Sequence, residues 1–136
     1  MPLKIGTITG GLAHAPVFVG NILNTDVVKV DISDLTTAEV DQFGNIKPGV
    51  PLDKSGNTIG DGVAVYGVTI EPINLGHATV PPTDVSLAAD TGTVFVAVGF
   101  GLVNRDIAED NLGRAYTAYE IAGFDLAGSN CRITRT

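Results

Sequence analysis

The residues best suited to chemistry are few in this chain, and they lie far apart in the sequence. The two histidines, His14 and His77, have no second ligand at a metal-binding spacing such as H-x-x-x-H or C-x-x-C. We therefore expect no metal site. His77 lies in a segment rich in Gly and Pro, where it could act as a general base. Because it has no partner nearby in the sequence, a surface histidine without a chemical role is the simpler interpretation.

The single cysteine, Cys131, cannot form an internal disulfide, so the sequence carries no mark of an oxidising compartment. Its neighbour Arg132 could lower the pKa of the thiol and make it a nucleophile. A lone cysteine near a terminus is more often a small buried apolar residue. We expect that second role here.

Two further patterns suggest chemistry but do not complete it. Gly99-Phe100-Gly101 resembles the opening of a dinucleotide-binding fingerprint, but Asn104 occupies the position of the third glycine. A glycine bend or bulge after a strand explains this pattern better. Glu109 and Asp110 are adjacent, and adjacent residues on a helix do not face each other, so we expect a solvated helix face. The sequence therefore predicts neither a cofactor nor an enzyme.

The charge balance narrows the range of partners. The chain carries 15 acidic and 8 basic residues, a formal net charge of −7, whereas nucleic-acid binding depends mainly on Lys and Arg against phosphate. We therefore expect no nucleic-acid partner and no binding to anionic membranes. No apolar run approaches the ~18 residues of a membrane span, and residues 1–4 lack the apolar core of a signal peptide. These features predict a soluble product that is not exported by that route.

The elements that must position these residues are mainly strands. Apolar residues make up 44% of the 136-residue chain but aromatic residues only 6%, so aliphatic side chains must fill the core. The 17 glycines and 7 prolines are distributed along the whole length and favour short strands joined by tight turns. The composition predicts a mainly β fold with one to three short helices. A compact small β-barrel or a β-sandwich, preceded by an N-terminal arm, would fit it.

Several segments have the apolar runs of strands. The run at 62–71 is almost wholly apolar, which predicts a strand buried on both faces. Residues 90–92 read as the turn of a hairpin that joins two further strands. The two prolines of 47–52 restrict that segment to a sheet edge, and 53–57 reads as a hairpin loop. The remaining predicted strands are 27–32, 85–88, 93–98 and 131–134.

Capping signals predict short helices. Thr36 and Glu39 have the spacing of a capping box, and Gly44 would end that turn of helix. Two longer helices are predicted further along the chain. Their start and stop signals are Asn104 and Gly113 for the first, and Thr117, Glu120 and Gly128 for the second.

Two segments have no clear element. Residues 1–25 form either an N-terminal arm or the first strands, ahead of a single β-rich domain at 26–136. Pro72 ends the strand before it, and residues 72–84 form a long loop. Long loops in compact domains are often functional.

The central segments resemble a known family. Residues 47–52 (KPGVPL), 60–68 (GDGVAVYGV) and 94–99 (VFVAVG), followed by the Val103-Asn104 step, are similar to the head decoration, or cement, proteins of tailed bacteriophages, the lambda type. In that family a PGTPL-like entry precedes a DGTAVGIL-like strand, and a later strand ends near a VN step. The resemblance covers roughly residues 45–130 and rests on patterns of small residues.

The resemblance implies a small β-rich virion protein that assembles as a homotrimer on the outer surface of the expanded capsid. There it would bind the major capsid protein and stabilise the head. An arm that adds a strand to an exposed sheet edge suits that role, although the same residues could form an ordinary first strand of the domain. The predicted capsid contacts are Pro2, Leu3, Lys4, Ile5, Thr7 and Ile8 in the arm, and Pro72, Asn74, His77, Pro81 and Pro82 in the long loop.

Two other classes of function remain open from the residues alone. A ligand- or carbohydrate-binding module, such as the base of a capsid fibre, could use the 72–84 loop. A small β-barrel enzyme could assemble a site from the distant residues His77, Asp84 and Asp106.

Overall fold

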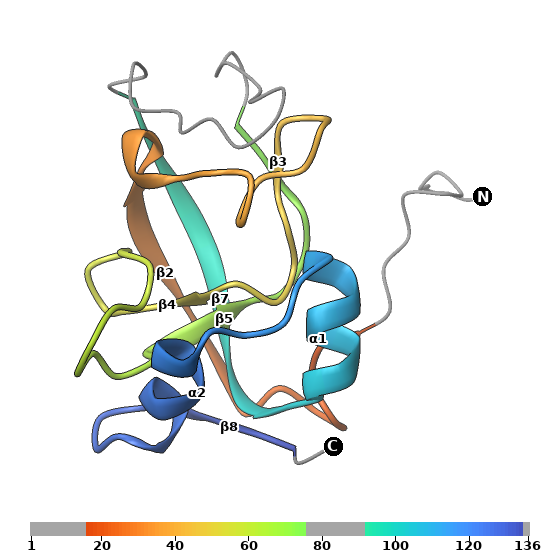
Figure 1. Ribbon diagram of the computed structural model, residues 1–136, viewed down its shortest axis with the longest axis vertical. Helices are drawn as coiled ribbons and strands as arrows, with labels where there is room; N and C mark the ends of the chain where they lie inside the picture. The colour runs from red at the N-terminus through yellow and green to blue at the C-terminus, as the bar shows by residue number, and fades with distance from the viewer. Residues whose placement is uncertain (1–15, 76–91, 135–136) are drawn as a thin grey trace.

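A five-stranded sheet forms the body of the protein in the computed structural model, which describes residues 16–75 and 92–134 (Figure 1). The strands run in the order β2, β7, β5, β4, and β8 pairs with the far end of β7. Neighbouring strands are antiparallel except for β8, which is parallel to β7. The strands are β2 (Asn24–Asp31), β4 (Pro51–Leu52), β5 (Gly67–Thr69), β7 (Thr93–Val103) and β8 (Cys131–Ile133).

The long strand β7 organises this sheet, because it pairs with β2, β5 and β8. Its pairing with β2 extends from Thr93 opposite Asp31 to Phe100 opposite Asn24. The sequence predicted both strands but underestimated their length, since β2 begins three residues before Val27 and β7 continues to Val103. Residues 85–88 lie outside the described residues, so the hairpin expected there stays a prediction.

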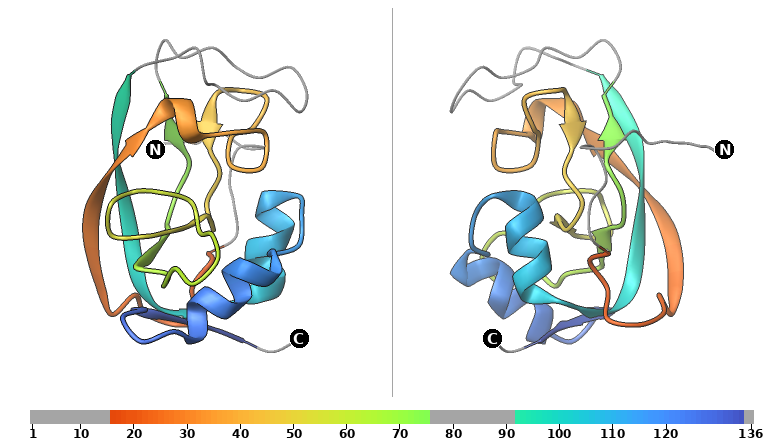
Figure 2. Two further views of the ribbon diagram at one scale, coloured as in Figure 1. Left: turned by 60° about the vertical axis from the view of Figure 1, so that its left-hand side comes forward. Right: turned by 90° about the vertical axis from the view of Figure 1, so that its right-hand side faces the viewer.

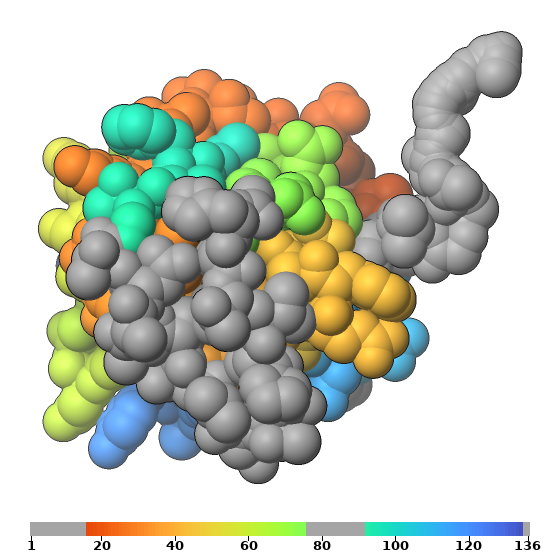
Figure 3. Space-filling view, turned by 90° about the horizontal axis from the view of Figure 1, so that it is seen from above, coloured from red at the N-terminus to blue at the C-terminus, as the bar shows by residue number. Residues whose placement is uncertain are grey.

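A two-stranded sheet of β3 (Asn45–Ile46) and β6 (Ile73–Asn74) lies beside the main sheet, and a short 3-10 helix, η2 (Ile32–Asp34), follows β2. Figure 3, seen from above, shows the segments that contain β3 and β6 next to each other. The fold is therefore mixed, with mostly strands and a few short helices, as the sequence predicted. Within the described residues the main sheet stays open and does not close into a barrel.

The two helices, α1 (Arg105–Leu112) and α2 (Ala118–Asp125), start where the capping signals predicted. The Asn104 side chain accepts from the N–H of Ile107, and Thr117 with Glu120 forms a complete capping box. Both views of Figure 2 place these helices together near β8, with β2 on the opposite side of the molecule. The second helix ends at Asp125, three residues before the predicted stop.

Residues from both sheets and both helices form one hydrophobic core. On one face of the β2–β7 pair, the side chains of Val28, Val30, Val96 and Val98 are buried in it. Phe124 of α2 packs against Tyr116, with ring centroids 5.4 Å apart, and the Tyr116 hydroxyl donates to the carbonyl oxygen of Gly49. The first described residues also belong to this packing, because Val17 and Phe18 are buried and Phe18 pairs with Val103.

Three local predictions need correction. The predicted helix at 36–44 is a single hydrogen-bonded turn, because Val40 donates to the carbonyl oxygen of Thr36 and then pairs with Ile46 as an isolated bridge, which takes the chain out of helical geometry. The predicted strand at 62–71 is a strand only at Gly67–Thr69. Glu109 is not part of a solvated face: its carboxylate accepts from the backbone N–H of Tyr116 at 2.7 Å and pairs with Arg105.

Candidate binding surface

Most of the side chains predicted to contact a partner lie outside the described residues. These are the whole arm set from Pro2 to Ile8, together with His77, Pro81 and Pro82. Pro72 and Asn74 are described and exposed, and the Asn74 amide donates to the Asn45 side chain at 2.9 Å. Asp106 is exposed in the first turn of α1, while Asp84 is outside the described residues. Of the enzyme site predicted from His77, Asp84 and Asp106, only Asp106 lies among the described residues, so that site stays a prediction.

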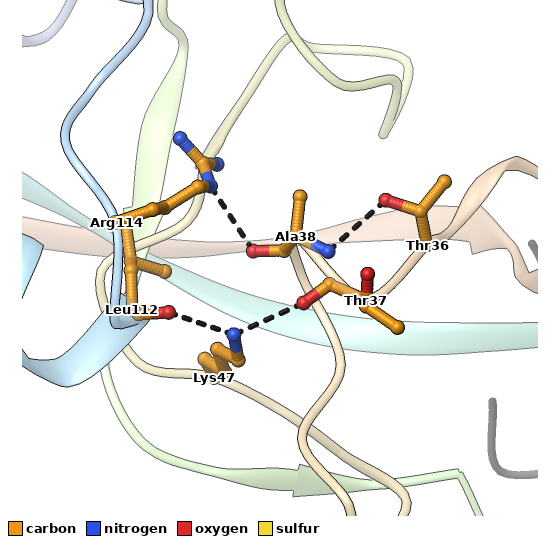
Figure 4. Close-up of a pocket in the computed structure, with 6 residues that line it drawn as sticks. All are labelled: Thr36, Thr37, Ala38, Lys47, Leu112 and Arg114. Carbon is orange, nitrogen blue, oxygen red and sulfur yellow. Dashed lines mark hydrogen bonds between the residues drawn. The ribbon is translucent and has the colours of Figure 1, made fainter. Parts of the chain in front are cut away.

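A cleft of about 410 Å³ is lined by Thr36, Thr37, Ala38, Lys47, Leu112 and Arg114. Figure 4 shows its lining, in which Lys47 lies between the 36–38 turn and the end of α1. The Lys47 ammonium donates to the carbonyl oxygens of Thr37 at 3.0 Å and Leu112 at 2.7 Å. A cation that binds the last carbonyls of a helix satisfies groups that have no partner in the helix. This contact joins the turn to α1.

Arg114 makes a second connection at the same cleft. Its Nε donates to the carbonyl oxygen of Ala38 at 3.2 Å, and its two terminal nitrogens bind both carboxylate oxygens of Glu120 at 2.8 and 3.1 Å. Glu120 is 5% exposed, so this two-bond ion pair is largely withdrawn from water. The guanidinium thus links α2 to the 36–38 turn.

Burial shifts the pKa values of two charged groups at or near the cleft, Glu39 and Lys47. Burial raises the pKa of the Glu39 carboxyl, which accepts from the backbone N–H and hydroxyl of Thr36. Burial lowers the pKa of the Lys47 ammonium. Each charged group here already binds a backbone or side-chain partner, which is what a structural ion cluster requires. The cleft therefore connects the 36–38 turn to both helices.

The thiol of Cys131 is equally inert. The residue is 1% exposed, and its sulfur lies 3.3 Å from the carbonyl oxygen of Gly99. Burial raises the pKa of the thiol to about 11, whereas a nucleophilic cysteine needs a lowered pKa and access to solvent. Its predicted role as a small buried apolar residue is confirmed.

The face of the β2–β7 pair that points away from the core is apolar and partly bare. Val27 and Phe95 are 56% and 69% exposed, and Ala97 lies directly opposite Val27. The rest of this face is covered by the protein's own chain. A Cβ at Gly99 would lie 3.0 Å from the Phe18 ring and 3.1 Å from Ile22, so these side chains occupy the space above the glycine. We call the exposed Val27 and Phe95, together with the half-buried Ala97, the outer strip.

The edge of β2 is protected, so a partner would reach the outer strip through side chains. The backbone N–H groups of Thr25 and Val27 donate to the side chains of Asn24 and Asp26, at 2.9 and 2.7 Å. In the 53–57 hairpin loop, Gly56 approaches β2 so closely that a Cβ there would lie 2.0 Å from the Lys29 carbonyl oxygen. Edge strands whose backbone groups are already engaged resist pairing with a further strand.

Sequence reasoning missed the outer strip. Residues 93–98 were predicted as a strand, and their apolar character on both faces was the signal available. Such a pattern is typical of a strand covered on both sides. Only the tertiary structure shows that residues 17–22 cover one half of the second face and leave Phe95 bare.

The described residues form neither a cluster of metal ligands nor a helix that could span a membrane. In 16–75 and 92–134, no three His, Cys, Asp or Glu side chains come together as metal ligands would. None of the helices in those ranges has the length and apolar character needed to cross a bilayer. No protein-family model matches the chain, and searches of curated proteins and of solved structures found no match either.

Proposed function

We propose that this protein is a structural component of a virion that binds the outer surface of a tailed-phage capsid, as a homotrimer, and stabilises the expanded head. The observation that carries the proposal is the outer strip, an apolar surface that residues 16–75 and 92–134 leave exposed. Exposed apolar side chains that lie together and are bordered by polar residues often mark an interaction site on a soluble protein. A surface of this kind suits binding to another protein.

The segments that resemble decoration proteins support the same proposal. Residues 51–52, 67–68 and 94–99 belong to β4, β5 and β7, which are neighbours in one sheet. Sequence similarity that falls on adjacent strands is similarity in one structural unit. The finer fold we propose is therefore the small β-rich architecture of that family, in which the arm predicted from the sequence, with contacts from Pro2 to Ile8, reaches the major capsid protein.

The proposed role requires no catalysis. A decoration protein needs a stiff body and repeated weak contacts, because many copies on a lattice gain avidity without strong single contacts. The ion pair of Arg114 and Glu120 and the Lys47 contact to α1 provide stiffness in the described body. No nucleic acid or membrane is involved in the proposed role.

Binding to capsids tests the proposal directly. Expanded empty heads would be assembled from the major capsid protein encoded in the same genome, mixed with this protein, and separated by sedimentation. We expect saturable binding to expanded heads, little binding to unexpanded shells, and a higher melting temperature of the decorated heads. Absence of binding, or a genome without a major capsid protein, would contradict the proposal. Binding to glycans in a parallel array would instead favour a carbohydrate-binding module.

A further inference from the structure

Aspartates at two hairpin loops of this protein have their side chains bound to the backbone. One carboxylate oxygen of Asp41 accepts from the N–H groups of the second and fourth residues after it, at 2.9 and 3.0 Å. The corresponding oxygen of Asp53 makes the same two contacts, both at 2.9 Å. Aspartates that bind the backbone two residues further along stabilise turns in this way. These two carboxyl groups are therefore held away from the N–H of the residue that follows them.

Asp61 is in a turn as well, but its carboxyl group is not held. The turn covers 60–63, and in it Val63 donates to the carbonyl oxygen of Gly60 at 3.4 Å. Asp61 and Gly62 are both exposed. Nothing within 16–75 and 92–134 forms a hydrogen bond with the Asp61 carboxylate or with the N–H of Gly62. A carboxyl group and a backbone N–H without partners thus lie next to each other in the chain.

The glycine at position 62 allows these two groups to react. Asp61-Gly62 is the single Asp-Gly pair of the chain, and the sequence contains no Asn-Gly pair. Because glycine has no Cβ, no side chain shields its nitrogen and its backbone changes conformation readily. Gly62 has a φ of +73°, and the space that a Cβ would occupy is open. The Gly62 nitrogen and Cγ of Asp61 can therefore close a five-membered ring.

We propose that Asp61 is a site of spontaneous backbone modification, at which the chain closes to a succinimide and reopens as isoaspartate. In the first step the Gly62 nitrogen attacks Cγ of the protonated Asp61 carboxyl group. The N–Cγ bond forms, the N–H proton leaves and one water molecule is lost. The inference goes beyond the proposed function and does not depend on it.

The second step adds one water molecule back, so the atoms balance without an oxidant, a metal or an enzyme. Water that breaks the bond between the nitrogen and Cγ restores aspartate. Water that breaks the bond between the nitrogen and the main-chain carbonyl carbon of Asp61 gives isoaspartate. The main chain then runs through Cβ and Cγ of this residue and is one carbon longer.

The longer turn acts on α2, which lies beside the yellow-green 60–65 segment in Figure 1. A Cβ at Gly123 of α2 would lie 2.6 Å from the carbonyl oxygen of Val63 and 3.1 Å from the Ile59 side chain. The N–H of Val65 donates to the carbonyl oxygen of Gly123 at 3.0 Å. Both ends of the turn are therefore packed closely on the helix. We expect isoaspartate to weaken the hydrogen bond between Val65 and Gly123.

Incubation in water labelled with heavy oxygen measures the reaction directly. Each passage through the succinimide introduces one heavy oxygen, whether the ring reopens as aspartate or as isoaspartate. The full chain is incubated near neutral pH and digested in ordinary water, and its peptides are analysed by mass spectrometry. Label should enter Asp61 about tenfold faster than Asp41 or Asp53, because those two have bound carboxylates and no glycine after them.

Two variants separate the effect of the fold from that of the dipeptide. Lys54→Gly, at an exposed position, places a glycine after Asp53, whose carboxylate stays bound to the N–H groups of Ser55 and Asn57. In the folded variant Asp53 should still react about tenfold more slowly than Asp61, and in urea the two rates should become similar. Asp61→Glu keeps the charge but would need a six-membered ring, so labelling at this position should be lost. Circular dichroism establishes that both variants are folded.

Label that enters Asp61 no faster than Asp41 in the wild type would overturn the inference, whatever the variants do. Equal labelling of Asp53 and Asp61 in folded Lys54→Gly would show that the dipeptide alone, and not the unbound carboxyl group, selects the site. The effect on α2 is measured by hydrogen exchange of the Val65 N–H in the isolated isoaspartate form. We expect faster exchange than in the aspartate form, and unchanged exchange would contradict the proposed effect on the helix.

Discussion

The cleft at Lys47 and the outer strip are two surface regions of opposite composition. The polar groups of the cleft have partners within the fold, whereas the apolar side chains of the outer strip are exposed. The cleft gathers charged groups, yet Lys47, Arg114 and Glu120 are all bound to partners within the fold. The outer strip consists of chemically inert side chains, yet Val27 and Phe95 are largely uncovered. Polar groups that already have partners stabilise the monomer. Exposed apolar surface contributes favourable free energy only when a binding partner removes it from water. In this protein the candidate binding site is therefore the exposed apolar strip and not the cleft in which polar groups gather.

The largest expected difference in the free energy of unfolding is between the alanine variants of Phe18 and Phe95. Phe18→Ala removes a ring that is 7% exposed and packs over Gly99, and we expect it to lower the free energy of unfolding by about 4 kcal/mol. Phe95→Ala should change it by less than about 0.5 kcal/mol, because this side chain is exposed in the monomer. Urea unfolding of both variants at a concentration where the protein is monomeric measures the difference. Equal losses would mean that Phe95 is covered within the monomer.

Removing a partner in the cleft should also destabilise the monomer. Glu120→Ala leaves the Arg114 guanidinium without its two-bond partner and breaks the capping box of α2. We expect a loss of about 3 kcal/mol in the free energy of unfolding. Asp110→Ala, an exposed acidic residue on α1, is the control and should have little effect. A loss of less than about 1 kcal/mol for Glu120→Ala would argue against a structural role for the ion pair.

Lys47 should contribute less than the ion pair. Lys47→Met keeps most of the side-chain volume but removes the donor for the carbonyl oxygens of Thr37 and Leu112. We expect a loss of about 2 kcal/mol, because two carbonyl groups lose a partner. Thermal unfolding measures this, and Lys54→Met in the exposed 53–57 loop is the matched control. If capsid binding fell while stability did not, the cleft would be a contact site after all.

The smallest expected effect depends on pH and has a definite sign. Burial raises the pKa of Glu39 in the folded protein above its ordinary value of 4.5. Between that value and the raised pKa the folded state binds more protons than the unfolded state, so this group's contribution to stability falls as pH rises. Glu39→Gln should therefore be more stable than the wild type at pH 7, and the difference should shrink as the pH falls to 4.5. Urea unfolding across this range checks the sign, and an opposite trend would contradict it.

Local sequence signals were sufficient to predict the position of several secondary-structure elements. The caps at Asn104 and Thr117 correctly predicted both helices, because a cap is a contact between residues three positions apart. The turn at 53–57 was also predicted correctly, with Asp53 and Asn57 bonded across it. The 62–71 segment was predicted as one long strand because it is almost wholly apolar. An apolar pattern predicts burial but not backbone pairing, and the strand β5 has only three residues.

The candidate sites could be predicted much less well. No local pattern reveals that Glu109 turns inward to Tyr116 or that Lys47 reaches Leu112, since the latter pair is 65 positions apart. The arm residues Pro2 to Ile8 and the loop residues His77, Pro81 and Pro82 lie outside the described residues and stay predictions.

The sequence by itself determined the class of fold, the position of the two helices and the apolar character of both faces of β7. These properties depend on residue type and on neighbours a few positions away. Only the tertiary structure decided which apolar face is covered, because residues 17–22 pack over Gly99 but stop short of Phe95. Burial is a property of segments brought together in space, and the exposed part of a strand depends on what the rest of the chain leaves uncovered.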